Sequence, residues 1–129
     1  MIVRPTLLIL TMIRTDNLTD SRSFLSQLSA VVQSGVETVV WAGDADFICN
    51  WFGNLIAANA VTYAGTSAFN AAALKSYTVA GAAAGTFKNV NNLSFLRVFG
   101  AGHEVPYYQP AASLQVFKQT MQQQPLSST

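Results

Sequence analysis

The chain has 129 residues, enough for one modest domain, and half of them are hydrophobic while only 10% are charged. Soluble domains carry about a quarter of charged residues, so this chain has little polar surface. The net charge of +1 excludes nucleic-acid binding through a basic patch, and a mean hydropathy of +0.30 excludes a disordered chain.

The N-terminal part contains a short apolar run, Leu7–Ile13, which follows Arg4. It resembles the core of a signal peptide, but no small-residue cleavage site follows, because Arg14 comes next. The run is also much shorter than the roughly 18 apolar residues of a membrane span. Three interpretations stay open: a targeting segment, a buried strand, or residues that do not belong to the fold.

From Asp20 onward the hydrophobic pattern is regular. Four apolar residues share one helical face and are followed by Gly35, which predicts a helix that ends there; they are Phe24, Leu28, Val31 and Val32. Residues 38–42 are β-branched or aromatic apart from Ala42 and precede Gly43, which predicts a buried strand. Residues 51–61 have a helical composition, and we expect residues 64–73 to be irregular.

The second half predicts a hairpin, a strand and a helix. Residues 75–79 and 86–90 alternate on either side of a Gly- and Ala-rich stretch, 81–85, which predicts a hairpin with a long turn. Residues 94–99 form the second clear strand, which ends at Gly100.

Pro110 fits the first turn of a last helix. Leu114, Phe117 and Met121 lie at helical spacing in this helix, and Pro125 ends it. We expect the Gln- and Ser-rich tail to be frayed. Helices that alternate with buried strands predict an α/β architecture.

Ionisable residues follow both clear strands at a Gly-marked turn: Asp44 and Asp46 after the first strand, and His103 after the second. Sites in open α/β sheets lie at the carboxyl ends of the strands, so these residues are able to converge. Asp followed by His also matches the last two members of the Ser, Asp, His order of α/β-hydrolases. A purely structural role for a lone His remains the alternative.

Two longer stretches that contain these residues resemble a known family. Trp41–Asn54, which reads WAGDADFICNWFGN, and Phe99–Pro110, which reads FGAGHEVPYYQP, closely resemble the C-terminal signatures of serine carboxypeptidases, especially those of filamentous fungi. The resemblance covers about residues 20–121. It implies the C-terminal part of an α/β-hydrolase fold, with the last strands of a mixed sheet and flanking helices, incomplete on its own. We therefore divide the chain into an unmatched segment, 1–19, and a carboxypeptidase-like part, 20–129.

The resemblance implies roles for five residues. Asp46 is the acid of the catalytic triad, and His103 is its base. Ile48 and the single cysteine, Cys49, form part of the wall of the pocket for the residue before the scissile bond. Glu104 lies beside the pocket for the leaving residue, with a solvated surface Glu as the alternative. No metal or cofactor is implied, and Asp44 is assigned to bracing its turn.

The nucleophile of the family is missing from the sequence. Its Gly-Glu-Ser-Tyr motif does not occur, and Ser34 and Ser67 lack the strand, turn and helix that expose such a serine. The resemblance still implies serine-type carboxypeptidase activity, with an upstream part supplying the Ser and peptide C-termini as substrates. The alternatives are a truncated, inactive fragment, a non-catalytic interaction module, and an acyl transferase or lyase on the same fold.

The family also implies a secreted or vacuolar location. Asn17 and Asn92 each begin a glycosylation sequon, which is compatible with that route. Asn92 precedes the second strand, and we expect it to be exposed in its loop. Neither nucleic acid nor a membrane is expected as a partner.

Overall fold

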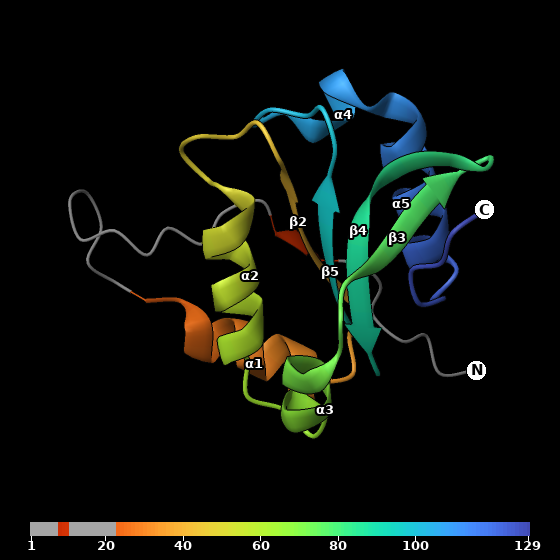
Figure 1. Ribbon diagram of the computed structural model, residues 1–129. Helices are drawn as coiled ribbons and strands as arrows, with labels where there is room; N and C mark the ends of the chain where they lie inside the picture. Colours follow the sequence, from red (N-terminus) through yellow and green to blue (C-terminus); the bar gives the residue numbers. More distant parts are fainter. Residues whose placement is uncertain (1–7, 11–22) are drawn as a thin grey trace.

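The computed structural model describes residues 8–10 and 23–129. A five-stranded sheet in the order β1-β2-β5-β4-β3 lies at its centre (Figure 1). The strands are β1 (Leu8–Leu10), β2 (Thr38–Gly43), β3 (Lys75–Val79), β4 (Ala82–Val90) and β5 (Leu93–Val98). The helices are α1 (Leu25–Gln33), α2 (Trp51–Ala60), α3 (Thr66–Ala71), α4 (Val105–Tyr108) and α5 (Pro110–Met121).

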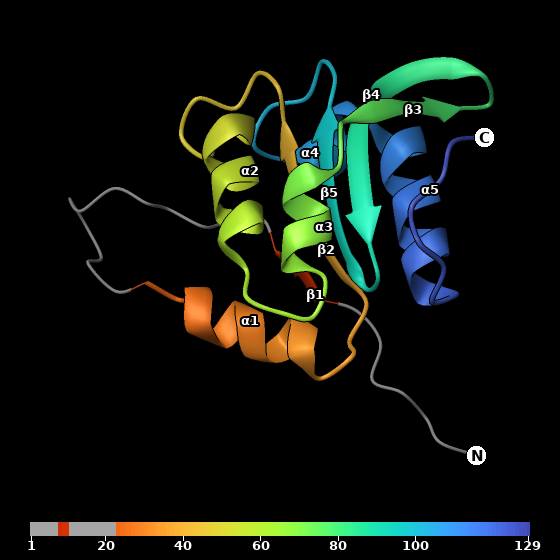
Figure 2. The ribbon, with the colours of Figure 1, turned by 60° about the horizontal axis from the view of Figure 1, so that its bottom comes forward.

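The sheet is mixed and is covered on both faces. Strands β1, β2 and β5 are parallel, whereas β4 and β3 run antiparallel to their neighbours. One hydrophobic cluster joins the sheet to α1, α2 and α3, and a second joins it to α4, α5 and the C-terminal tail. The two groups of helices lie on opposite sides of the sheet (Figure 2). Every residue of β2 is buried, which explains why its sequence is a continuous apolar run without alternation. The predicted α/β architecture is confirmed.

The parallel pairing of β2 with β5 determines where the ionisable residues lie. Gly43 pairs with Val98, so the two strands end side by side at the same edge of the sheet. Two loops leave this edge, one leading to α2 and the other to α4 (Figure 1). Because the strands are neighbours, residues that are more than fifty positions apart in the sequence lie next to each other.

Two local predictions were wrong. Residues 66–71 form α3, although the segment 64–73 was expected to be irregular. This helix buries only Phe69, so it has no apolar period that the sequence could reveal. The hairpin has a short turn, because β4 already begins at Ala82 and pairs with Val79. Ala80 and Gly81 both have positive φ angles, 50° and 79°, as a two-residue turn of this type requires.

The last helix presents a different face to the core from the one expected. Leu114, Phe117 and Met121 are exposed to 53%, 47% and 46%. The face that packs against the sheet is instead that of Ala112 and Val116. The tail is also ordered rather than frayed. Leu126 is buried, and the amide of Thr129 donates to the carbonyl oxygen of Thr78 in β3 at 3.0 Å.

The N-terminal run is described only in part. Its backbone at Leu8–Leu10 forms β1, which pairs in parallel with β2, so these three residues take the strand interpretation. The rest of the run, together with Asn17, lies outside the described residues.

Candidate active site

Asp46 is held by the turn that precedes α2. Its Oδ1 accepts hydrogen bonds from the backbone amides of Ile48 and Cys49, both at 3.0 Å, and the residue is only 8% exposed. The side chain of Asn50 then accepts from the amide of Gly53 and caps the helix. With one oxygen fixed by two amides, the other oxygen, Oδ2, has a defined direction.

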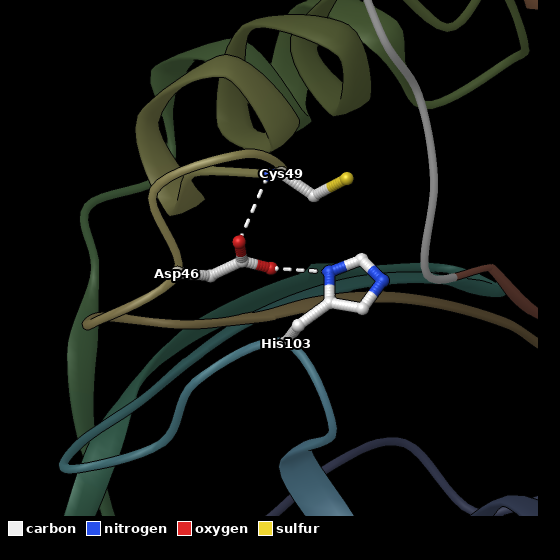
Figure 3. Close-up of side chains that lie close together, drawn as sticks. All are labelled: Asp46, Cys49 and His103. Carbon is white, nitrogen blue, oxygen red and sulfur yellow. Dashed lines mark hydrogen bonds and ion pairs between the residues drawn. The ribbon is translucent and has the colours of Figure 1, made fainter.

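That direction leads to His103. The Oδ2 of Asp46 lies 2.9 Å from the Nδ1 of His103, which comes from the loop after β5 (Figure 3). The convergence of the two loops, expected from the sequence, is confirmed. Because Nδ1 is engaged by the carboxylate, the neutral ring carries its proton there and leaves Nε2 as the acceptor. The side chain of His103 is 48% exposed, so the imidazole is accessible to an incoming group.

The charge of Asp46 is stabilised by its surroundings. Burial by itself raises the pKa of Asp46, but hydrogen bonds from the Cys49 and Ile48 amides and from His103 lower it, as does the charge of the imidazole. These effects outweigh burial, and the pKa of Asp46 lies below its ordinary value. A carboxylate that stays ionised is able to stabilise a positively charged imidazole.

The remaining predicted site residues lie around this pair. Ile48 is 65% exposed beside it, and Cys49 is 4% exposed. Glu104 is exposed at the start of α4, directly after His103. Three atoms that could bind a metal ion lie within 4.8 Å of one another, one each from Asp46, Cys49 and His103. Both Asp46 oxygens and Nδ1 of His103 are already engaged with each other or with backbone amides, which favours an acid and base pair over a metal site.

A second polar pair, Asp44 and Arg97, lies next to the first. From the sequence, a role was predicted for only one of the two residues, Asp44. Asp44 was expected to brace its own turn, but its Oδ1 accepts from the amide of Gly100 in the opposite loop at 2.8 Å. Its Oδ2 lies 3.5 Å from Nη2 of Arg97. Arg97 was not recognised in the sequence, although a single charge within the apolar strand 94–99 was the available signal.

The geometry defines a class of protein. A mixed sheet covered by helices, with a carboxylate and imidazole pair at the carboxyl ends of adjacent parallel strands, is the arrangement of an α/β-hydrolase. The family model described as Serine carboxypeptidase matches residues 11–123. The chain therefore belongs to the serine carboxypeptidase family. This match begins nine residues before the boundary that we drew at Asp20.

Individual relatives agree with this family. The chain is 62% identical over 108 residues to Carboxypeptidase S1 of Penicillium janthinellum, which covers 84% of this chain and 26% of the relative. It is 39% identical over 95 residues to Carboxypeptidase Y of Schizosaccharomyces pombe, covering 74% of this chain and 10% of the relative. Among solved structures, Kex1(delta)p, a prohormone-processing carboxypeptidase from Saccharomyces cerevisiae, matches with a TM-score of 0.66 at 25% identity. That match covers 81% of this chain and 23% of the yeast protein.

Proposed function

We propose that the chain supplies the acid and base of a serine-type carboxypeptidase, an enzyme that releases amino acids from the C-termini of peptides. The single observation that carries this proposal is the 2.9 Å contact between Asp46 Oδ2 and His103 Nδ1 at the shared edge of β2 and β5. Family membership supports the same activity. The chain spans about a quarter of its Penicillium relative, 26%. We therefore propose the activity for the complete family domain, of which this chain is one part.

The geometry fits one direction of proton transfer. Asp46 holds the imidazole of His103 through Nδ1 and stabilises its charged form, while Nε2 takes the proton from a serine hydroxyl. The serine then forms an ester with the acyl part of the peptide, and Nε2 returns the proton to the leaving amine. Water attacks the ester in the second half, with His103 again acting as base. This chemistry uses no metal or cofactor.

The serine is supplied from outside the described residues. Within residues 8–10 and 23–129, no serine hydroxyl is hydrogen-bonded to His103. The hydroxyl of Ser34 donates to the carbonyl oxygen of Val31 at the end of α1, and Ser67 lies in α3. Both helices lie at the end of the sheet opposite the two site loops (Figure 1). Because the Gly-Glu-Ser-Tyr motif also does not occur in the sequence, we assign the nucleophile to a part of the family domain outside these 129 residues.

Three neighbouring residues are assigned to substrate recognition. The exposed side chain of Ile48 and the buried Cys49 border the Asp46 carboxylate, which suits the wall of a pocket for the residue before the scissile bond. Glu104 follows His103 directly and is exposed, which suits the pocket for the leaving residue. A carboxylate at that position favours a Lys or Arg as the leaving residue.

We propose a secreted or vacuolar location, which rests on the family. In the described part of the chain, no helix is long and apolar enough to cross a membrane.

Glycosylation at Asn92 is disfavoured, and the expectation of an exposed acceptor there is wrong. Its Nδ2 donates to the carbonyl oxygens of Val32 at 2.8 Å and Val36 at 2.7 Å, so both amide hydrogens are engaged.

A chimera tests the proposed function. In it, this chain replaces the corresponding quarter of Carboxypeptidase S1 from Penicillium janthinellum, with which it shares 62% identity. We expect the chimera to release C-terminal amino acids from N-blocked peptides, and His103→Ala to lower kcat/KM by about ten-thousandfold because the base is lost. Asn70→Ala, an exposed change in α3, serves as the control. Near-normal turnover by His103→Ala would refute the assignment. A folded but inactive chimera would favour the truncated, inactive alternative.

A further inference from the structure

Asp44 connects the two loops that carry the catalytic pair. It lies two residues before Asp46 in the loop after β2, yet its carboxylate reaches the loop after β5. There Oδ1 accepts the amide hydrogen of Gly100 at 2.8 Å. Gly100 has a φ of 64°, so the bond fixes a left-handed turn three residues before His103.

Arg97 holds the Asp44 carboxylate in place. Its guanidinium lies 4.3 Å from the ring centre of Trp51, the first residue of α2, and 5.4 Å from that of Phe99. These two cation–π contacts restrict the guanidinium independently of Asp44. The arginine then contacts Oδ2 of Asp44 at 3.5 Å, which leaves Oδ1 directed at Gly100.

We propose that Asp44 is a positioning residue, which sets the orientation of the His103 imidazole by fixing the Gly100 turn relative to Asp46. The proposal rests on the proposed function, in which His103 is the base. Backbone bonds from Asp44 to Val98 and from Ala45 to Ala101, both at 2.9 Å, join the bases of the loops. The Asp44 side chain adds the contact at the turn itself.

The contact from Asp44 to Gly100 is partly exposed to solvent, and this allows a positioning role of Asp44 to be distinguished from a role in fold stability. Gly100 is exposed, and the side chains of Arg97 and Asp44 are 31% and 21% exposed, so water replaces the lost bonds at small cost in folding free energy. Removing the Asp44 carboxylate is therefore expected to change the mobility of the His103 loop more than the stability of the fold. Asp44→Asn retains an oxygen that accepts from Gly100, whereas Asp44→Ala does not.

The test uses nuclear magnetic resonance on the full chain, in which His103 is the single histidine. We expect its Nδ1 proton, which is hydrogen-bonded to the carboxylate of Asp46, to give a resolved downfield resonance. In Asp44→Ala we expect this proton to exchange with water at least about tenfold faster than in the wild type, and in Asp44→Asn to exchange at nearly the wild-type rate. Circular dichroism and thermal unfolding are expected to be close to wild type for both variants.

Three results would overturn the proposal. One is an unchanged exchange rate in a folded Asp44→Ala chain, and another is an Asp44→Asn chain as fast as Asp44→Ala. The third is an Asp44→Ala chain that fails to fold, which would make the residue structural. None of these measurements needs the nucleophile, so they are independent of whether the chimera is active. In an active chimera, Asp44→Ala is further expected to lower kcat about tenfold with KM nearly unchanged.

Discussion

The two oxygens of Asp46 have separate tasks. Two backbone amides hold Oδ1 at 3.0 Å, and this leaves Oδ2 for the imidazole at 2.9 Å. A buried carboxylate is costly unless it is hydrogen-bonded, so the amides of the turn before α2 make the buried position possible. The contact with His103 and the local fold of the loop therefore depend on the same side chain.

Asp46 is expected to make folding stability depend on pH in the acid range. Its pKa is lower in the folded chain than in the unfolded chain, where an Asp titrates near pH 4, so the unfolded state binds the proton more readily. The stability that Asp46 contributes is thus complete above about pH 4 and is lost as the pH falls through the lower, folded value. Urea unfolding of the wild type and Asp46→Asn between pH 7 and pH 2 measures this contribution.

The difference between the two chains is the informative quantity, because other groups titrate as well. Glu37, for example, has a pKa raised by burial, which acts with the opposite sign in this range. Asn retains an oxygen for the two amides but has no acidic proton. The wild-type advantage over Asp46→Asn should shrink as the solution is acidified. An advantage that is constant with pH would contradict the assignment of the low pKa to Asp46.

At the scale of elements, some features could be predicted from the sequence because several residues repeat the same signal. Strand β2 is apolar at nearly every position, and its end is marked by Gly43, so the placement of Asp46 after it followed directly. The hydrogen-bond partner of each ionisable group was harder to predict from the sequence. The contact from Asp44 to Gly100 depends on the pairing of β2 with β5, which no local pattern encodes.

The errors at α3, at α5 and in the C-terminal tail have a common physical origin in tertiary contacts. Helix α3 has a single buried apolar anchor, Phe69, and the face of α5 is set by packing around Val116 rather than by its largest side chains. The C-terminal tail is ordered through contacts such as the 2.8 Å bond from Gln119 Nε2 to the carbonyl oxygen of Ser127. A polar segment of this kind has no apolar period, so its sequence predicts a frayed end.

The close approach of the two site loops should be sensitive to a single methyl group. A Cβ on Gly43 would lie 2.1 Å from the carbonyl oxygen of Ala101, a backbone atom that has to move to make room. We expect Gly43→Ala to lower the free energy of unfolding by about 1–3 kcal/mol. The same shift separates Asp46 from His103, so exchange of the His103 Nδ1 proton should accelerate. Urea unfolding and the imidazole resonance measure the two effects.

Gly53→Ala is the matched control for that substitution. Its Cβ would lie 3.4 Å from Oδ1 of Asn50, an ordinary contact, and the residue lies inside α2. Alanine is favoured over glycine in a helix by about 0.5–1 kcal/mol, so this variant should be more stable than the wild type. Equal effects of the two substitutions would show that the loop contact at Gly43 is not special.

At the scale of the whole molecule, the sheet has a filled core but the outer surface carries many apolar side chains. Phe47, Phe52 and Ile56 are exposed to 94%, 58% and 51%, near or along α2. A chain with only 10% charged residues has few groups that oppose association of such surfaces. These features match a domain part whose relatives are several times longer.

The exposed stripe of α5, defined by Leu114, Phe117 and Met121, is expected to promote self-association of the isolated chain. Their spacing places the three side chains on one helical face, and each is about half exposed. Replacing all three by Gln, a good helix former, should lower the weight-average mass toward the 13.8 kDa monomer in sedimentation experiments at matched concentrations, with the circular dichroism spectrum unchanged. Gln at Ala68 and Asn70, exposed positions of α3, is the control and should associate like the wild type. If the triple variant associates as strongly as the wild type, the contact surface lies elsewhere, and the exposed side chains near α2 become the surface to test.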